Sequence, residues 1–177
     1  MNKAAKLIEH VLLLRCQIGD REAFAELIER YERPLRYFIS RLLENSEMTE
    51  DIFQDTWLTV IPRIHGLKEI DAFPVWLYRI ARNKVYQQLR KDKKEIELNE
   101  KIAVPNDAED DKFSHEDAAK LHKCLEKLRP EHKEVLMLRF LEQMSYDRIS
   151  QVINCNVGTV RSRIYYAKLA LKKEMEN

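Results

Sequence analysis

Hydrophobic residues recur along most of this chain at intervals of three and four, the spacing that places them on one face of an α-helix. The stretch 73–89 shows the pattern clearly. Its apolar positions are Phe73, Leu77, Ile80, Ala81, Val85 and Leu89. No run of four or more residues alternates as a Val-, Ile- or Thr-rich strand between turns. The pattern therefore predicts an all-α protein.

The N-terminal part of the chain is predicted to be a block of helices and short turns. Asp20 is expected to cap a helix, because its carboxylate can accept hydrogen bonds from the free N–H groups at a helix start. Pro34 is expected to interrupt or restart that helix, since proline has no N–H to donate. Pro62 is expected to end a helix that begins near Glu47, and residues 63–71 are expected to form a loop.

Two small helical domains are predicted, joined by a flexible acidic linker. Residues 1–92 are assigned to the first domain, residues 93–114 to the linker and residues 115–177 to the second domain. The linker has little apolar content, contains the helix-breaking sequence VPND and accumulates Asp and Glu. In the second domain one inward face is predicted to carry Val135, Leu136, Leu138 and Leu141.

The formal net charge of +1 conceals blocks of opposite sign. Residues 79–94 carry seven Lys and Arg against one acid, the linker is acidic, and the stretch 161–173 is basic again. The apolar run LIEHVLLL near the N-terminus is too short to span a membrane, so a cytoplasmic protein without direct membrane insertion is expected.

No chemistry of catalysis is apparent in the sequence. The cysteines Cys16, Cys124 and Cys155 match no zinc or redox spacing and are interpreted as reduced structural thiols. A nuclease or transposase would need carboxylates clustered around two metals, whereas the acids here fall mainly in the linker and on solvent-facing helix positions. Neither an enzyme nor a bound metal or cofactor is expected.

The segment 146–165 is predicted to be a helix-turn-helix. This motif needs a small residue in its first helix, a residue that tolerates positive φ at the turn and an apolar residue that docks the second helix. Ser150, Asn154 and Val160 meet these three demands, and Asn156 can cap the second helix. The candidates for DNA contact are Thr159, Arg161, Ser162, Tyr165 and Tyr166. An ordinary helical hairpin with a basic outer face is the alternative.

The side of the 73–91 helix away from its apolar stripe combines cations with large aromatic rings. Single-stranded DNA needs cations for its phosphates and flat rings for its bases. The candidates for such contact are Trp76, Arg79, Arg82, Asn83, Tyr86, Gln87 and Arg90, with Tyr78 on the same side. Trp76 can equally pack between helices, and Asn83 can equally cap or bridge them.

Five motifs together resemble the extracytoplasmic-function (ECF) sigma factors, the small two-domain initiation subunits of bacterial RNA polymerase. In chain order they are TEDIFQDTW (49–57), WLYRIARN (76–83), LRPEHKEVLMLRF (128–140), SYDRIS (145–150) and GTVRSRI (158–164). The resemblance implies a sigma region 2 domain that binds core polymerase and recognises and melts the promoter −10 element. It implies a sigma region 4 domain whose helix-turn-helix recognises the −35 element.

The same resemblance implies partners. They are core RNA polymerase, through its β′ clamp helices and β flap, promoter DNA in duplex and single-stranded form, and an anti-sigma factor. The surface implied for the clamp helices carries Glu50, Asp51, Gln54, Asp55 and Leu58. A solvated charged helix face has the same composition. The alternative for the whole chain is a helix-turn-helix regulator that acts without being a polymerase subunit.

Three positions depart from the family pattern. Gln87 stands where the family usually has Asp, Asn154 stands where the turn usually has Gly, and Arg148-Ile149-Ser150 replaces the usual Glu-Ile-Ala. Gln87 and Arg148 lie near the expected DNA faces, so the promoter preference does not follow from the resemblance.

Overall fold

The computed structural model describes residues 3–43, 45–98 and 123–176. Every regular element among them is helical, which confirms the all-α class. The elements are α1 Lys3–Gln17, α2 Arg21–Leu43, α3 Ser46–Val60, η1 Ile61–Gly66, η2 Ile70–Ala72, α4 Phe73–Leu98, α6 Pro130–Leu136, η3 Met137–Leu141, α7 Tyr146–Ile153 and α8 Val157–Glu176. We call residues 3–98 the N-terminal half and residues 123–176 the C-terminal half.

Polar caps start two helices of the N-terminal half, α2 and α3. Asp20 Oδ1 accepts hydrogen bonds from the backbone N–H groups of Glu22 and Ala23, at 3.0 and 3.1 Å, which confirms it as the cap of α2. The bond from Ala23 and the neighbouring Arg15 guanidinium lower the pKa of Asp20. Asn45 caps α3 in the same way, and its Oδ1 accepts from the backbone N–H of Met48 at 3.0 Å.

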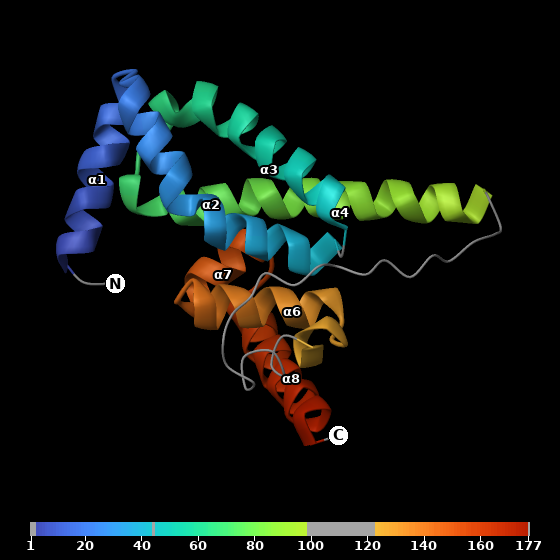
Figure 1. The fold of residues 1–177 in the computed structure, drawn as a ribbon. Coiled ribbons are helices and arrows are strands. Elements are labelled where there is room, and N and C mark those ends of the chain that lie inside the picture. The colour runs from blue at the N-terminus through green and yellow to red at the C-terminus, as the bar shows by residue number, and fades with distance from the viewer. Residues whose placement is uncertain (1–2, 44, 99–122, 177) are drawn as a thin grey trace.

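Pro34 does not interrupt α2, so that prediction was wrong. A proline inside a helix removes one backbone hydrogen bond and costs about 3 kcal/mol. The buried face nevertheless continues on both sides of it, and each large apolar side chain returns about 1.5–3 kcal/mol on burial. This face includes Leu27, Tyr31, Leu35, Phe38 and Ile39. Figure 1 shows α2 changing direction part-way along its length, as an internal proline allows.

The connection between α3 and α4 is more regular than the loop predicted for residues 63–71. α3 ends before Pro62 as expected, but η1 and η2 then form two short segments of 3-10 helix. Gln17 Nε2 donates hydrogen bonds to the carbonyl oxygens of Ile64, at 3.2 Å, and Leu67, at 2.7 Å. These bonds tie the connection to α1 immediately before α4 begins.

The predicted linker and the C-terminal half differ from expectation at two places. α4 continues to Leu98, so residues 93–98 are helical, while residues 99–114 lie outside the described part of the chain. Leu141 is exposed, although its three predicted neighbours on the inward face are buried. The cause is the π-helical turn of η3, whose wider winding moves Leu141 off the α-helical face.

One continuous apolar core joins the two halves. α4 packs against α2 and α3 and also against α7 of the C-terminal half. α6 contacts α2 and lies below it in Figure 1. The C-terminal half therefore covers part of α4, the helix that carries one of the two predicted DNA-binding surfaces.

Candidate nucleic-acid and protein-binding surfaces

The apolar stripe predicted for α4 is confirmed as its buried face. Phe73, Leu77, Ala81 and Val85 are fully enclosed, and Ile80 and Leu89 are partly buried. On the other side of the helix, the predicted candidates that remain exposed are Arg79, Asn83, Gln87 and Arg90. These four present two cations and two amides to solvent along one helix.

The aromatic side chains of α4 are less available than the helical pattern predicts. The expectation for Tyr78 was wrong, because it is fully buried and its ring meets Phe38 edge to face, with 5.1 Å between the ring centroids. Burial, and then the Glu142 carboxylate, raise the pKa of Tyr78. Trp76 is half-buried and packs edge to face on Phe73, at 6.2 Å between ring centroids. The prediction from the sequence assumed that α4 buries one face only. Helices of both halves pack against α4, so Tyr78 is buried as well.

Arg82 and Tyr86 are joined to α6 by Glu134. Arg82 Nε donates a hydrogen bond to Glu134 Oε1, and the Tyr86 hydroxyl donates to Glu134 Oε2 at 3.2 Å. The Arg82 guanidinium also lies over the Tyr86 ring, 4.4 Å from its centroid. Glu134 is fully buried, and burial raises its pKa although the Arg82 charge opposes the shift. We call these three residues the Glu134 cluster.

The helix-turn-helix is confirmed in its local geometry. Asn154 ends α7 in the left-handed conformation, with φ 53° and ψ 55°, as the turn requires. The backbone N–H groups of Asn154 and Cys155 both donate to the carbonyl of Ser150 and close the turn. Asn156 Oδ1 then accepts a hydrogen bond from the backbone N–H of Thr159, at 2.8 Å, which confirms it as the cap of α8.

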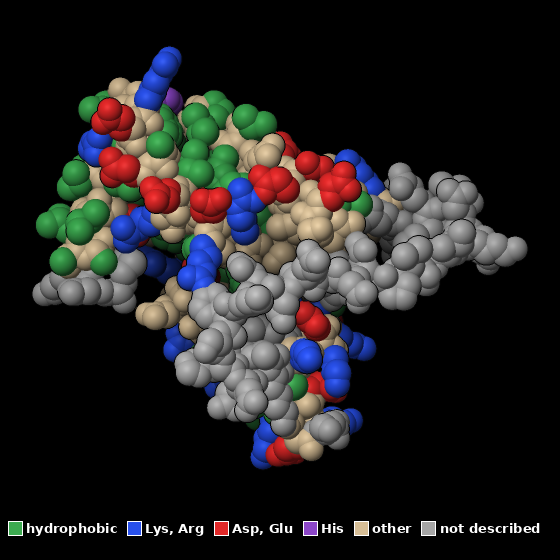
Figure 2. Space-filling model, in the orientation of Figure 1, with side chains coloured by type: hydrophobic (Ala, Val, Ile, Leu, Met, Phe, Trp, Pro, Cys, Tyr) green, Lys and Arg blue, Asp and Glu red, His purple; other side chains and the backbone are tan. Residues whose placement is uncertain are grey.

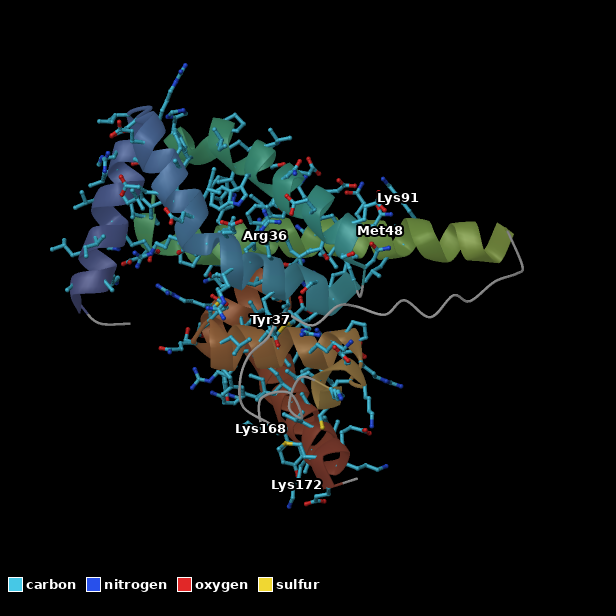
Figure 3. All side chains as sticks on the ribbon, viewed as in Figure 1. Arg36, Tyr37, Met48, Lys91, Lys168 and Lys172 are labelled. Carbon is cyan, nitrogen blue, oxygen red and sulfur yellow. The ribbon has the colours of Figure 1, made fainter. Side chains whose placement is uncertain are left out.

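α8 buries one face and exposes another that carries most of the predicted DNA contacts. Val160, Ile164 and Ala167 are buried. Arg161, Ser162, Tyr165 and Tyr166 are exposed, and Thr159 is half-exposed with its hydroxyl on Asn156 Oδ1. The two tyrosine rings meet edge to face, with 5.4 Å between centroids. In Figure 3, Lys168 and Lys172 mark the continuation of α8 away from α4.

The predicted acidic strip lies on the solvent side of α3. We use this name for Glu50, Asp51, Gln54, Asp55 and Leu58. All of them are exposed except Glu50, which is half-exposed, paired with Arg36 and also accepts a hydrogen bond from Gln54 Nε2. Leu58 exposes 70% of its surface, an apolar side chain at the end of a polar row. Figure 2 shows acidic side chains gathered over α2 and the adjoining part of α3.

Comparison with known proteins matches both halves of the chain to one family. The model of sigma-70 region 2 matches residues 27–95, and the model of sigma-70 region 4 matches residues 114–171. The ECF RNA polymerase sigma factor SigW of Bacillus subtilis is 28% identical, over 90% of this chain and 92% of its own length. The chain belongs to the ECF sigma factors of the sigma-70 family. The ECF RNA polymerase sigma-E factor of Haemophilus influenzae is 26% identical, over 98% of both chains.

Solved structures share the fold of this sigma factor. The sigma factor RpoE in its complex with the anti-sigma factor NepR from Bartonella quintana matches with a TM-score of 0.77 and 23% identity, over 86% of this chain and 96% of that one. CnrH, in complex with the cytosolic domain of CnrY, matches with a TM-score of 0.66 and 20% identity, over 95% and 97%. These matches support the arrangement of helices described above.

Family membership establishes the general activity. This sigma factor is a non-enzymatic subunit that directs RNA polymerase in transcription initiation. The alternative of a regulator acting without polymerase is thereby rejected. Within the described residues, no three His, Cys, Asp or Glu side chains come together as metal ligands, and no helix there is long and apolar enough to cross a membrane.

Two carboxylates of this sigma factor, the fully buried Glu134 and the half-buried Glu142, were missed in the sequence. Glu134 and Glu142 both approach α4 from the C-terminal half, Glu134 beside Arg82 and Glu142 beside Tyr78. A signal for Glu134 was present. It directly precedes the apolar run 135–138 and lies one helical turn before Leu138, on a face where a charged residue needs a partner. That the partner is Arg82 could be known only from the packing of the two halves.

Proposed function

We propose that this sigma factor reads two promoter elements with two separate helices while a third helix holds core polymerase. The first domain, residues 1–92, binds the enzyme and handles the −10 element, and the second, residues 115–177, recognises the −35 element. Residues 93–114 connect them. The observation that carries the proposal is the presence of two distinct cationic and aromatic surfaces, on α4 and α8, in one chain with an exposed acidic strip on α3.

On α4, the −10 surface consists of Trp76, Arg79, Arg82, Asn83, Tyr86, Gln87 and Arg90. The arginines supply charge for phosphates, and the amides supply donors and acceptors for base edges. Tyr86 supplies a ring on which an unpaired base can stack. Because Trp76 packs on Phe73, it shapes this surface through its exposed edge.

On α8, the −35 surface consists of Thr159, Arg161, Ser162, Tyr165 and Tyr166. In a helix-turn-helix the start of the second helix meets base edges in the major groove. Arg161 and Ser162 lie in the second turn of α8, so they are assigned to base contact. The tyrosines further along are assigned to the sugar–phosphate edge of the groove.

The partners follow from the same surfaces. The acidic strip on α3 suits the β′ clamp helices of core polymerase, and the family resemblance assigns the C-terminal half to the β flap. Two proteins of similar fold are bound to partners, one being the anti-sigma factor NepR. This supports control of the present sigma factor by an anti-sigma factor.

Promoter opening tests the role of α4. Transcription starts mapped after overexpression supply a promoter, on which thymines near −10 react with permanganate once the strands separate. Alanine at Arg82, Asn83 and Tyr86 together should reduce this reactivity and leave closed-complex formation largely intact. Arg21→Ala, an exposed cation on α2, is the control and should behave as the parent. Normal opening by the triple variant would assign this face of α4 to structure instead.

A further inference from the structure

In the Glu134 cluster, a carboxylate of the C-terminal half binds Arg82, a cation assigned above to DNA binding. Only 17% of the Arg82 side chain is exposed, and the Glu134 side chain is fully buried. Arg82 donates to one carboxylate oxygen and Tyr86 donates to the other. Nothing from solvent can take the place of this carboxylate while α6 stays against α4.

A carboxylate offers Arg82 the same kind of partner as a DNA phosphate, namely anionic oxygens that accept charge-assisted hydrogen bonds. The Tyr86 ring is also occupied, because the Arg82 guanidinium already lies over it, where a base would stack. The two residues are thus engaged in the way that single-stranded DNA would engage them. Binding a strand at this part of α4 requires Glu134 to leave.

We propose that the C-terminal half is an autoinhibitory cover for the −10 surface, with Glu134 as the group that occupies the position of a phosphate. The inference rests on the assignment of α4 to the −10 strand. In the closed arrangement the protein without polymerase binds single-stranded DNA weakly at α4. Separation of α6 and α7 from α4 uncovers Arg82 and Tyr86 and allows the strand to bind.

Other contacts hold the same closed arrangement. Arg148 on α7 donates to the carbonyl oxygen of Asp71, at 3.3 Å, and Arg41 on α2 pairs with Glu126. Tyr78 is fully enclosed where α4 meets the C-terminal half, close to Glu142. The cover therefore combines an apolar contact with charged pairs, and the charged pairs fix its register.

The arrangement can open because Glu134 has a second cation within its own half. Arg163 on α8 is close enough to favour the ionised form of Glu134, so this carboxylate keeps a charge partner after Arg82 is lost. The exposed residues of α8, Arg161 and Ser162 among them, are not covered in the closed arrangement. The −35 surface is thus available while part of the −10 surface is closed.

Charge reversal at Glu134 tests the cover. Glu134→Lys places an ammonium opposite Arg82, whereas Glu131→Lys makes the same change of charge at a half-exposed position of the same helix. The first readout is the radius of gyration by small-angle X-ray scattering, with circular dichroism to check helix content. The second is binding of a fluorescent, sequence-randomised single strand of DNA to the protein without polymerase.

Glu134→Lys should expand the protein and tighten strand binding by about tenfold, since apparent affinity rises with the fraction of open molecules. Glu131→Lys should stay compact and tighten binding only by its added charge. The cover is disproved if folded Glu134→Lys stays as compact as the parent. It is also disproved if that variant expands but binds the strand no better than Glu131→Lys.

A second pair of variants decides the matter even if Glu134→Lys does not fold. Arg82→Glu leaves the C-terminal half unaltered and sets two carboxylates against each other, so it should expand the protein. Adding Glu134→Arg restores an opposite pair and should restore the compact form. Equal size of the single and double variants would contradict the cover. Failure of the −10 assignment is distinguished from failure of the cover by promoter opening. The triple alanine variant of α4 would then open a promoter normally, whatever radius of gyration the charge variants have.

Discussion

At the scale of single residues, two non-glycine positions adopt positive φ in the C-terminal half. Asn154 has φ 53° at the helix-turn-helix, and Gln143 has φ 52° in the connection before α7. Left-handed backbone costs an L-residue roughly 1–2 kcal/mol, less for Asn, whose short polar side chain can bond locally. Asn154 replaces the glycine that is usual in the family, yet it adopts the left-handed conformation that this turn requires.

Replacing these residues should change stability in opposite directions. Asn154→Ala should lower the free energy of unfolding by about 1 kcal/mol, because alanine lacks the polar side chain that eases the left-handed conformation. Gln143→Gly should raise it by a similar amount, since glycine adopts positive φ without a steric penalty. Urea unfolding of the full chain measures both. A stabilising Asn154→Ala would mean that the turn does not need the left-handed residue.

Arg161 and Tyr166 should affect −35 binding in different ways. Arg161→Ala should flatten discrimination at particular −35 bases, with a loss of about 1–3 kcal/mol if the guanidinium makes a bidentate base contact. Tyr166→Arg should raise affinity for many sequences and steepen the salt dependence, because it adds a phosphate-neutralising charge. Binding over a salt series, on promoters with single −35 substitutions, measures both. Equal weakening of all sequences by Arg161→Ala would assign that residue to phosphate.

At the scale of elements, α3 divides its residues cleanly between core and solvent. Ile52, Phe53, Thr56, Trp57 and Val60 are buried, while the acidic strip occupies the opposite side. Gln54 donates to Glu50 one turn earlier, at 2.9 Å, and Lys84 of α4 pairs with Asp55. These are exposed contacts, which contribute little to stability. The strip can therefore be altered without loss of the helix.

Reversing charge in the strip should weaken polymerase binding and leave folding intact. Asp51→Arg together with Gln54→Arg replaces an acid and an amide on exposed positions of α3. The expected result is a higher dissociation constant for core polymerase with an unchanged unfolding transition. Glu47→Arg, exposed on the first turn of the same helix, separates a local effect from a change in net charge. Core binding as tight as that of the parent would remove the strip from the interface.

At the scale of the whole molecule, two carboxylates face α4 from the C-terminal half, Glu134 fully buried and Glu142 half-buried. Burial raises the pKa of Glu134 against the opposing effects of Arg82, Tyr86 and Arg163, and burial raises the pKa of Glu142 against that of Tyr78. Both groups hold a proton more readily in the closed arrangement than they would in water. By linkage, the closed arrangement is favoured at low pH and weakens as pH rises through the raised pKa values.

Compactness should consequently depend on pH. Above the ordinary pKa of a glutamate, where the facing arginines and tyrosines keep their charge state, the radius of gyration should fall as pH falls. Glu134→Gln removes one of the two titrating carboxylates, so it should stay compact and respond less. His132 lies on the same helix α6, so His132→Gln is measured over the same pH series as the control. A radius of gyration that rises as pH falls would contradict the role given to these carboxylates.

The features that the sequence determined are local. Helices follow from apolar spacing along one segment, and the caps at Asp20, Asn45 and Asn156 need only the nearest backbone N–H groups. The turn at Asn154 is local for the same reason. The exposed faces of α3 and α8 also follow from periodicity, because each of these helices buries a single side.

The tertiary structure decided the features that depend on packing between helices distant in sequence, or on a balance between buried apolar contacts and a lost backbone hydrogen bond. Pro34 stays inside α2 because the buried face on both sides of it outweighs one lost hydrogen bond. Tyr78 is buried because a single-face pattern does not describe a helix packed by both halves. Arg82 is partnered with Glu134 because two segments far apart in sequence meet at α4. Periodicity reports which side of a helix is apolar, whereas the partner of a charged side chain is fixed only when the halves pack together.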